Sequence, residues 1–264
     1  MQTFIITGAS RGVGAALVRE LMRPGHSLFC VSRSLSDELI AESNDAGVEL
    51  HWIQADLAET RSLDAFMATI AERVASEGSD AITLINNAAV LSPVGLIGSA
   101  SADEIAEAVS VNLVAPMVLT HSFVRHFGAA ACPRTVINVS SGAGASPMPG
   151  LSTYSTTKAA LNAFTRACAG EPVPGSPGAG DPGPAPPIRF YAVSPGTADT
   201  SMQEELRAAN PTVLPDHETY VEWKRSGSLV SPRASARAIL SLLARDDVAN
   251  GSFIHYQDLT ETNQ

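Results

Sequence analysis

Tyr154 and Lys158 are four residues apart in a segment compatible with a helix, so their side chains share one helix face. An ammonium group beside a phenol favours the phenolate and lowers the pKa of the tyrosine from about 10 towards neutral pH. This pair therefore predicts a general acid or base at Tyr154. Because the spacing is common in proteins, the prediction depends on the residues around the pair.

Ser141 adds a hydroxyl group to this pair. It follows the predicted strand 135–140 at its carboxyl end, and ligands bind at this edge of parallel α/β sheets. The hydroxyl of Ser141 is predicted to hold a substrate oxygen. Ser140 is the neighbouring alternative for this role.

A glycine-rich turn lies between the first predicted strand and a helix. Its residues are Gly8, Ala9, Ser10, Arg11, Gly12, Val13 and Gly14. Glycines let the backbone turn tightly and approach a pyrophosphate, and the start of the next helix offers free N–H groups and the positive end of its dipole. A strand before the turn and a helix after it predict a dinucleotide site.

The second predicted strand ends at Arg33, near the point where an acidic residue would bind the ribose of NAD. No acidic residue is present there, and Arg33 supplies a planar cation suited to the 2′-phosphate of NADP(H). Arg11 in the glycine-rich turn adds a second positive charge. The alternative is that both arginines are simply solvated, but the missing acidic residue favours NADP(H).

Short apolar runs alternate with longer helix-like segments. The runs suit strands that are covered on both faces. The predicted strands are 3–7, 27–32, 50–54, 82–86, 135–140, 188–194 and 252–256. The predicted crossover helices are 13–22, 63–75, 102–127 and 153–169. This alternation predicts an α/β fold, a Rossmann-type doubly wound parallel sheet of about seven strands, in a single domain of residues 1–264.

Residues 172–187 interrupt the alternation with seven prolines and four glycines. Such a segment forms neither a helix nor a ladder strand and predicts an extended surface loop. Because it precedes the strand 188–194, it should lie at the amino edge of the sheet, opposite the edge where ligands bind. It is therefore not expected to be an active-site lid.

The composition is that of a globular protein, with 45% apolar residues, 17% charged residues and a formal net charge of −10. An acidic surface repels phosphate backbones and anionic lipids, so neither a nucleic acid nor a membrane is an expected partner. No uninterrupted apolar run reaches the roughly 20 residues of a membrane span, and no basic segment typical of a signal peptide precedes the first strand. The three cysteines lack metal-site spacing and predict reduced thiols in a cytoplasmic protein without a bound metal.

With these features the sequence resembles the classical short-chain dehydrogenase/reductase family. The matching residues, in order across nearly the whole chain, are Thr7-Gly8-x-x-x-Gly12-x-Gly14, Asn86-Asn87-Ala88, Asn112, Ser141, Tyr154-x-x-x-Lys158 and Pro195-Gly196-x-x-x-Thr200. The resemblance implies an enzyme that moves a hydride to or from a carbonyl carbon, and Arg33 and Arg11 favour NADP(H) as its cofactor. It also favours Ser141 over Ser140, because Ser141 precedes Tyr154 by the family's thirteen residues.

The resemblance implies a role for each matching position. Tyr154 would donate a proton to the reduced carbonyl, Ser141 would orient that carbonyl, and Lys158 would tune Tyr154 and bind ribose. Asn112 would complete a proton relay through water. The implied cofactor contacts are Gly8, Ser10, Arg11, Gly12, Val13, Gly14, Arg33, Asp56, Leu57, Asn87, Ala88, Tyr154, Lys158, Pro195, Gly196 and Thr200.

Two features depart from the family's pattern. Position 89 is Ala where the family usually has Gly, and a positive φ at Ala89 would cost about 1 kcal/mol. A local adjustment with retained activity is expected there. The Pro/Gly-rich segment 172–187 lengthens a connection that is usually short.

The last third of the chain resembles the sepiapterin reductase branch, whose bacterial members include benzil reductases. The matching segments are 194–203, 226–230 and 238–243, and the segments 4–8 and 82–87 resemble the benzil reductase type. The branch implies that one carbonyl of a diketone is reduced to give an α-hydroxy ketone.

The segment 197–229 would fold over the substrate, and its apolar candidates for this cover are Met202, Tyr220 and Trp223. Ordinary helix packing is the alternative for each of the three. The candidate substrate contacts are Met148, Leu151, Met202 and Asp258. Asp258 falls where a carboxylate anchors the pterin in sepiapterin reductases, and an exposed acidic residue near the C-terminus is the alternative.

Three other functions are alternatives to the reduction of a diketone. They are a sepiapterin reductase, an NAD-linked alcohol dehydrogenase working in the oxidative direction, and a non-catalytic NADP-binding regulator. All four expected catalytic positions are occupied, which disfavours the regulator. The helices 102–127 and 153–169 resemble the family's dimerisation pair, so a homodimer is expected, with a tetramer as the alternative.

Overall fold

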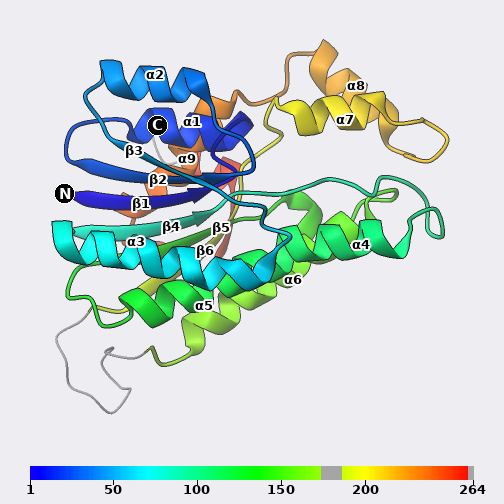
Figure 1. Cartoon of the computed structure of the whole chain (residues 1–264). Coiled ribbons are helices and arrows are strands. Elements are labelled where there is room, and N and C mark those ends of the chain that lie inside the picture. Colours follow the sequence, from blue (N-terminus) through cyan, green and yellow to red (C-terminus); the bar gives the residue numbers. More distant parts are fainter. Residues whose placement is uncertain (174–185, 261–264) are drawn as a thin grey trace.

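Seven parallel strands form one sheet in the computed structural model, which describes residues 1–173 and 186–260 (Figure 1). Their order across the sheet is β3-β2-β1-β4-β5-β6-β7. The chain moves outward from β1 to β3 and then returns to the other side of β1, which opens a crevice at the carboxyl ends of β1 and β4. The strands are β1 (Gln2–Thr7), β2 (His26–Ser32), β3 (Leu50–Gln54), β4 (Ala81–Asn86), β5 (Arg134–Val139), β6 (Ile188–Ser194) and β7 (Phe253–His255).

The apolar runs explain why the central strands form. In β1, Phe4, Ile5 and Ile6 are each at most 2% exposed. Phe4 and Ile6 pack with α1 and α9, whereas Ile5 packs on the other face with α3 and α5. A strand covered on both faces needs apolar residues at successive positions, which is the pattern of a parallel sheet. Each predicted strand agrees with an observed one to within one residue at either end.

Helices cover both faces of the sheet, with α1, α2 and α9 on one face and α3, α5 and α6 on the other (Figure 1). The predicted helices 13–22, 63–75 and 153–169 are confirmed to within two residues. The helix bounds are α1 (Gly12–Leu21), α2 (Asp37–Asp45), α3 (Leu63–Glu77), α4 (Ala102–Val109), α5 (Ala115–Phe127), α6 (Ser152–Gly170), α7 (Ser201–Ala208), α8 (His217–Arg225), α9 (Pro232–Ser241) and α10 (Tyr256–Thr260).

The predicted helix 102–127 is interrupted by a wider turn. Between α4 and α5 the chain forms a π-helical segment, Ser110–Val114, with Asn112 in its middle. π-helical turns inside α-helices occur frequently at functional sites. By length and composition the 26-residue stretch could cross a membrane, with a mean hydropathy of 1.3 over its most apolar window. Half of that window is buried inside the fold, as expected for a core helix.

The Pro/Gly-rich segment 172–187 falls mostly on residues 174–185, outside the part of the chain that the structure describes. Its flanks are described. Val173 packs against the core beneath α3 and α5, and the Pro186 carbonyl accepts a hydrogen bond from the Arg134 guanidinium at the start of β5. Both flanks therefore lie at the amino edge of the sheet, away from the carboxyl ends of the strands.

The segment 197–229, which contains α7 and α8, lies beyond the carboxyl ends of the strands (Figure 1). Its ends are tied together by a parallel bridge between Ala198 and Val230. An ion pair of 2.7 Å joins Lys224 of α8 to Asp199. We call residues 197–229 the cover segment.

Candidate active site

Tyr154 and Lys158 lie on the buried face of α6, where their side chains are 8% and 2% exposed. The Lys158 Nζ lies 5.8 Å from the centroid of the Tyr154 ring and donates a hydrogen bond of 2.8 Å to the Val139 carbonyl. Val139 ends β5, so the helix face and the carboxyl edge of the sheet meet at this lysine. The predicted shared helix face is confirmed.

The two adjacent serines after β5 have different partners. Ser141 accepts a hydrogen bond of 3.1 Å from the Ala143 N–H, and its side chain also hydrogen-bonds Tyr154. The Ser140 hydroxyl is buried and donates to the Lys158 carbonyl at 3.3 Å. Ser141 is therefore the serine that stands beside the phenol.

Burial controls the protonation of both central groups. Burial raises the pKa of Tyr154, and the hydrogen bond from Ser141 offsets only part of that rise. Burial also lowers the pKa of Lys158 to about 8. The expected lowering of the Tyr154 pKa by Lys158 is therefore wrong for this arrangement. Loss of hydration disfavours the charged form of both groups, and the ammonium is directed to the Val139 carbonyl. At neutral pH Tyr154 keeps its proton, which is the state that a proton donor needs.

Asn112 uses its carboxamide to hold the loop that follows β4. Its Oδ1 accepts from the Val90 N–H and its Nδ2 donates to the Val90 carbonyl, each at 2.8 Å. The same Nδ2 lies 3.4 Å from the Thr157 hydroxyl of α6. The side chain thus links the π-helical segment, the chain after β4 and the helix that carries Tyr154.

The glycine-rich turn forms a cradle that side chains would fill. A Cβ atom at position 14 would lie 2.0 Å from the Gly8 carbonyl oxygen. Gly8 itself has φ +66°, and a Cβ atom there would lie 2.8 Å from the Ala88 Cα. The first turn of α1 has no acidic residue and no side-chain cap, so its N–H groups remain available for an anion. This cradle fits the pyrophosphate of a dinucleotide.

Asn87 and Ala88 fasten β4 to this turn. Asn87 Nδ2 donates to the carbonyls of Thr7 and Gly8 at 2.9 and 3.3 Å, and the Ala88 N–H donates to the Thr7 hydroxyl at 3.1 Å. No non-glycine residue in the described chain has a positive φ, so Ala89 carries no such strain. The family's glycine is not required here by backbone conformation.

The remaining predicted cofactor residues line the same edge of the sheet. The Asp56 carboxylate accepts from the Ala58 N–H at 3.0 Å, and Leu57 is buried. Within the described residues neither the Arg11 nor the Arg33 side chain has a hydrogen-bond or ion-pair partner.

The loop after β6 closes the crevice from the other side. Gly196 packs against the ring of Tyr256, a residue that lies outside every sequence motif named above. A Cβ atom at Gly12 would lie 3.1 Å from the Thr200 side chain, so the glycine-rich turn and the start of α7 almost touch.

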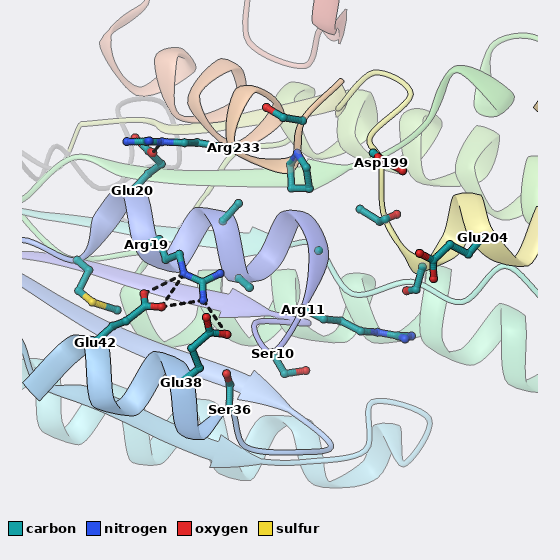
Figure 2. Close-up of a pocket in the computed structure, with 18 residues that line it drawn as sticks. Ser10, Arg11, Arg19, Glu20, Ser36, Glu38, Glu42, Asp199, Glu204 and Arg233 are labelled. Carbon is teal, nitrogen blue, oxygen red and sulfur yellow. Dashed lines mark hydrogen bonds and ion pairs between the residues drawn. The ribbon is translucent and has the colours of Figure 1, made fainter. Parts of the chain in front are cut away.

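A hollow of about 930 Å³ opens beside the glycine-rich turn (Figure 2). Ser10, Arg11 and Gly12 line one part of it, and Asp199 and Glu204 line the part near α7. Figure 2 shows Arg11 extended towards the end of the hollow where Glu204 lies, whereas Arg19 is held by Glu38 and Glu42. None of the residues lining this hollow belongs to the group around Tyr154.

Tyr154 instead faces an apolar cluster. Its buried members are Leu91, Ala143, Leu151, Tyr154, Leu206, Leu214 and Tyr220, and Val94, Met148, Met202, Ala209 and Trp223 pack against them. We call this set the Tyr154 cluster. Leu206, Leu214 and Tyr220 come from the cover segment, and the rings of Tyr220 and Trp223 pack at nearly a right angle with 5.4 Å between centroids. The structure thus brings together the predicted substrate residues Met148, Leu151 and Met202.

Asp258 lies outside the Tyr154 cluster. Its carboxylate is exposed and accepts a hydrogen bond of 3.1 Å from the His255 N–H at the start of α10. The predicted contact with substrate therefore has no support from this placement. Among the described residues, no group of three or more His, Cys, Asp or Glu side chains is arranged to hold a metal ion.

Comparison with known proteins shows which proteins this chain resembles in sequence and in fold. The family model for short chain dehydrogenases matches residues 2–211. A benzil reductase ((S)-benzoin forming) of Bacillus cereus is 32% identical over 260 residues, which cover 98% of this chain and 100% of that protein. A sepiapterin reductase of Bos taurus is 31% identical over 267 residues, which cover 96% of this chain and 94% of that protein. The crystal structure of the KRED1-Pglu enzyme matches with a TM-score of 0.77 at 25% identity, covering 96% of this chain and 100% of that one. The chain belongs to the short-chain dehydrogenase/reductase family, in the branch of the benzil and sepiapterin reductases, and is an oxidoreductase acting on CH–OH and C=O groups.

Proposed function

We propose that this protein is an NADPH-dependent carbonyl reductase that reduces one carbonyl of a benzil-like diketone to an α-hydroxy ketone. The observation that carries the proposal is the placement of the protonated Tyr154 hydroxyl beside Ser141, at the wall of an apolar cluster. The relatives named benzil reductase, from Bacillus cereus and Bacillus subtilis, support the choice of a diketone.

The side chains supply the proton and the positioning that the reaction needs. NADPH held at the glycine-rich turn would supply the hydride for the carbonyl carbon. Ser141 holds the carbonyl oxygen, and Tyr154 gives its proton to that oxygen as negative charge develops. The diketone thereby gains one hydride and one proton, and NADP⁺ and the hydroxy ketone are formed.

The Tyr154 cluster suits an aromatic or otherwise bulky substrate. Its side chains are aliphatic, aromatic or thioether groups, which recover free energy when apolar substrate surface is buried against them. They also keep water away from Tyr154, which strengthens the hydrogen bonds to the reacting oxygen. An apolar diketone satisfies both conditions.

The purified protein with NADPH is expected to reduce benzil and related aromatic diketones, with kcat/KM at least about 10-fold higher than for simple aliphatic ketones, because a hydrophobic pocket favours each added apolar group. The measurement is the loss of NADPH absorbance, with the product identified by chromatography. Sepiapterin belongs in the same panel, since sepiapterin reductases are among the relatives. Failure to oxidise NADPH with benzil, with other diketones and with sepiapterin would contradict the assignment to this branch.

Arg33 and Arg11 are proposed to bind the 2′-phosphate of NADPH. Arg33→Ala is expected to weaken NADPH binding by about 10- to 100-fold and to leave NADH binding within about 3-fold, because only NADPH loses a charge-assisted hydrogen bond. Both affinities are measured by quenching of tryptophan fluorescence. Arg23→Ala, at an exposed position between α1 and β2 and therefore at the amino edge of the sheet, is the matched control. Unchanged NADPH affinity in Arg33→Ala would refute this assignment.

The homodimer through α4, α5 and α6 stays a prediction from the family resemblance.

A further inference from the structure

Gln203 is a buried polar side chain that the proposed chemistry leaves unused. It lies in α7 of the cover segment and is 9% exposed. Its Oε1 is shielded from solvent and has no hydrogen-bond partner within the described residues. Burying an unsatisfied amide group costs about 1–3 kcal/mol, so such a side chain calls for a partner.

The neighbours of Gln203 on α7 belong to the Tyr154 cluster. Leu206 follows it by one helical turn and is a buried member of that cluster, and Met202 packs against the same cluster. Residues three apart on a helix are neighbours on its surface. Gln203 therefore lies at the edge of the apolar face that α7 turns towards Tyr154.

The chemistry of a carboxamide defines the partner. Its oxygen and its NH₂ group exchange places by a half-turn about the last side-chain bond, so either end can occupy the buried position. A ketone oxygen accepts hydrogen bonds and cannot donate them. The NH₂ end of Gln203 would therefore face a ketone substrate.

A diketone has one carbonyl more than the catalytic groups require. Ser141 and Tyr154 hold the oxygen of the carbonyl that is reduced. The second carbonyl oxygen would enter an apolar cluster, and its burial without a donor is unfavourable. A hydrogen bond between the Gln203 amide and the second carbonyl oxygen would satisfy both buried groups.

We propose that Gln203 is the residue that recognises the second carbonyl of the substrate, by donating a hydrogen bond from its Nε2 to that oxygen. The proposal rests on the proposed reduction of diketones at Tyr154 and extends it to the basis of selectivity. It assigns diketones as preferred substrates over monoketones of equal size. Gln203 is a specificity residue in this assignment and takes no part in proton transfer.

Arg207 offers a competing explanation. It follows Gln203 by four residues, and its Nη1 is likewise buried without a partner. Residues four apart share one helix face, so on this explanation the guanidinium donates to the Gln203 Oε1 and Gln203 serves only to hold the arginine within the cover segment. In that case Gln203→Leu and Arg207→Met would have equal effects on every substrate.

The experiment compares benzil with deoxybenzoin, which keeps both phenyl rings and one carbonyl but replaces the second carbonyl with CH₂. In Gln203→Leu, kcat/KM for benzil is expected to fall by about 10- to 100-fold, whereas kcat/KM for deoxybenzoin changes by less than about 3-fold. Leucine fills a similar space and removes the unsatisfied group, so the melting temperature should stay the same or rise. Glu205→Leu, at an exposed position on the same helix, is the matched control and should change neither substrate.

Two outcomes would overturn the proposal. One is an unchanged ratio between benzil and deoxybenzoin in Gln203→Leu, and the other is an equal loss for both substrates in Gln203→Leu and Arg207→Met. If the wild-type protein reduces neither ketone, the proposed function fails. The role of Gln203 is then tested by comparing the binding of benzil with that of deoxybenzoin. Binding to the NADP⁺ complex is then measured by quenching of Trp223, which packs against the Tyr154 cluster. The proposal is supported if the wild-type protein binds benzil more tightly than deoxybenzoin and Gln203→Leu abolishes this preference. It is overturned if Gln203→Leu leaves the preference unchanged, or if the wild-type protein shows none.

Discussion

Tyr154→Phe is expected to lower kcat for ketone reduction by about 10²- to 10⁴-fold, the range that a positioned general acid contributes. The change removes one oxygen atom and leaves the ring in the Tyr154 cluster. NADPH affinity should therefore stay within about 3-fold of the wild-type value. If Tyr154 acted mainly by binding the cofactor, the change would instead weaken NADPH binding and lower kcat/KM together. Steady-state kinetics and a fluorescence titration with NADPH measure the two quantities.

The pH dependence gives a second test of Tyr154. Burial raises the pKa of the phenol, so the proton donor stays protonated through the neutral range and is lost only at alkaline pH. Reduction by the wild-type protein should accordingly fall twice as the pH rises, first near pH 8 as Lys158 loses its charge and again as the pH passes the raised pKa of Tyr154. The residual activity of Tyr154→Phe should lack the second decrease.

Tyr191→Phe is the matched control. Tyr191 is a buried tyrosine of β6, and its hydroxyl donates to the Val248 carbonyl at 3.4 Å on the side of the sheet that α1 and α9 cover. This variant should keep wild-type kinetics. Retention of more than a tenth of kcat by Tyr154→Phe, with the melting temperature unchanged, would show that another group donates the proton.

Features that depend on short stretches of sequence could be predicted. The strands follow from apolar runs that need cover on both faces, and β3 and β6 begin and end at the predicted residues. The shared face of Tyr154 and Lys158 follows from helical spacing alone. The crevice at the glycine-rich turn follows from a strand, a turn and a helix in succession.

Features that depend on packing between distant segments could not be predicted in this way. The π-helical turn at Asn112 accompanies a pairing with Val90, which lies 22 residues away in the chain. The direction of the Tyr154 pKa depends on how completely other segments bury the phenol, which a spacing does not reveal. Leu91 and Leu214 reach the Tyr154 cluster from separate loops, and their own neighbours in sequence give no sign of it.

Lys158→Met is expected to make the protein more stable and less active at the same time. Burial lowers the pKa of Lys158 from 10.5 to about 8, and a shift of this size corresponds to a cost of about 3 kcal/mol for the charged lysine in the folded protein. Methionine removes this charge and keeps much of the side-chain volume. It also leaves the Val139 carbonyl without its donor, which returns about 1–2 kcal/mol of the gain. The expected net rise in the free energy of unfolding at pH 7 is about 1–2 kcal/mol, or roughly 2–8 °C in melting temperature.

The direction of the Lys158 pKa shift determines the pH range in which Lys158→Met is more stable than the wild type. A lysine whose pKa is lower in the folded than in the unfolded chain costs no stability above the unfolded pKa of 10.5, where it is neutral in both states. Stability is lost as the pH falls from 10.5 to about 8, because the unfolded chain then binds the proton more tightly than the folded protein. The stability advantage of Lys158→Met should therefore be complete below pH 8 and shrink as the pH rises from about 8 towards 10.5. Chemical denaturation at several pH values measures it.

Lys158 and Lys224 are the two lysines of the sequence, so the effect can be assigned to one residue. Selective isotope labelling of lysine gives two NMR signals, and the signal that Lys158→Met removes should titrate near pH 8. Lys224→Met, which removes a half-exposed ion pair with Asp199, should change stability by less than about 1 kcal/mol and leave the titration of Lys158 in place.

Activity decides whether the buried charge has a function. kcat/KM for ketone reduction by Lys158→Met is expected to fall by at least about 100-fold, because methionine cannot donate the hydrogen bonds by which the ammonium is proposed to hold the cofactor ribose beside the substrate carbonyl. A more stable protein with this loss of activity would show that the charge is kept for catalysis at the expense of stability. A more stable and fully active Lys158→Met would contradict the role of Lys158, whereas a less stable variant would contradict the cost of burying its charge.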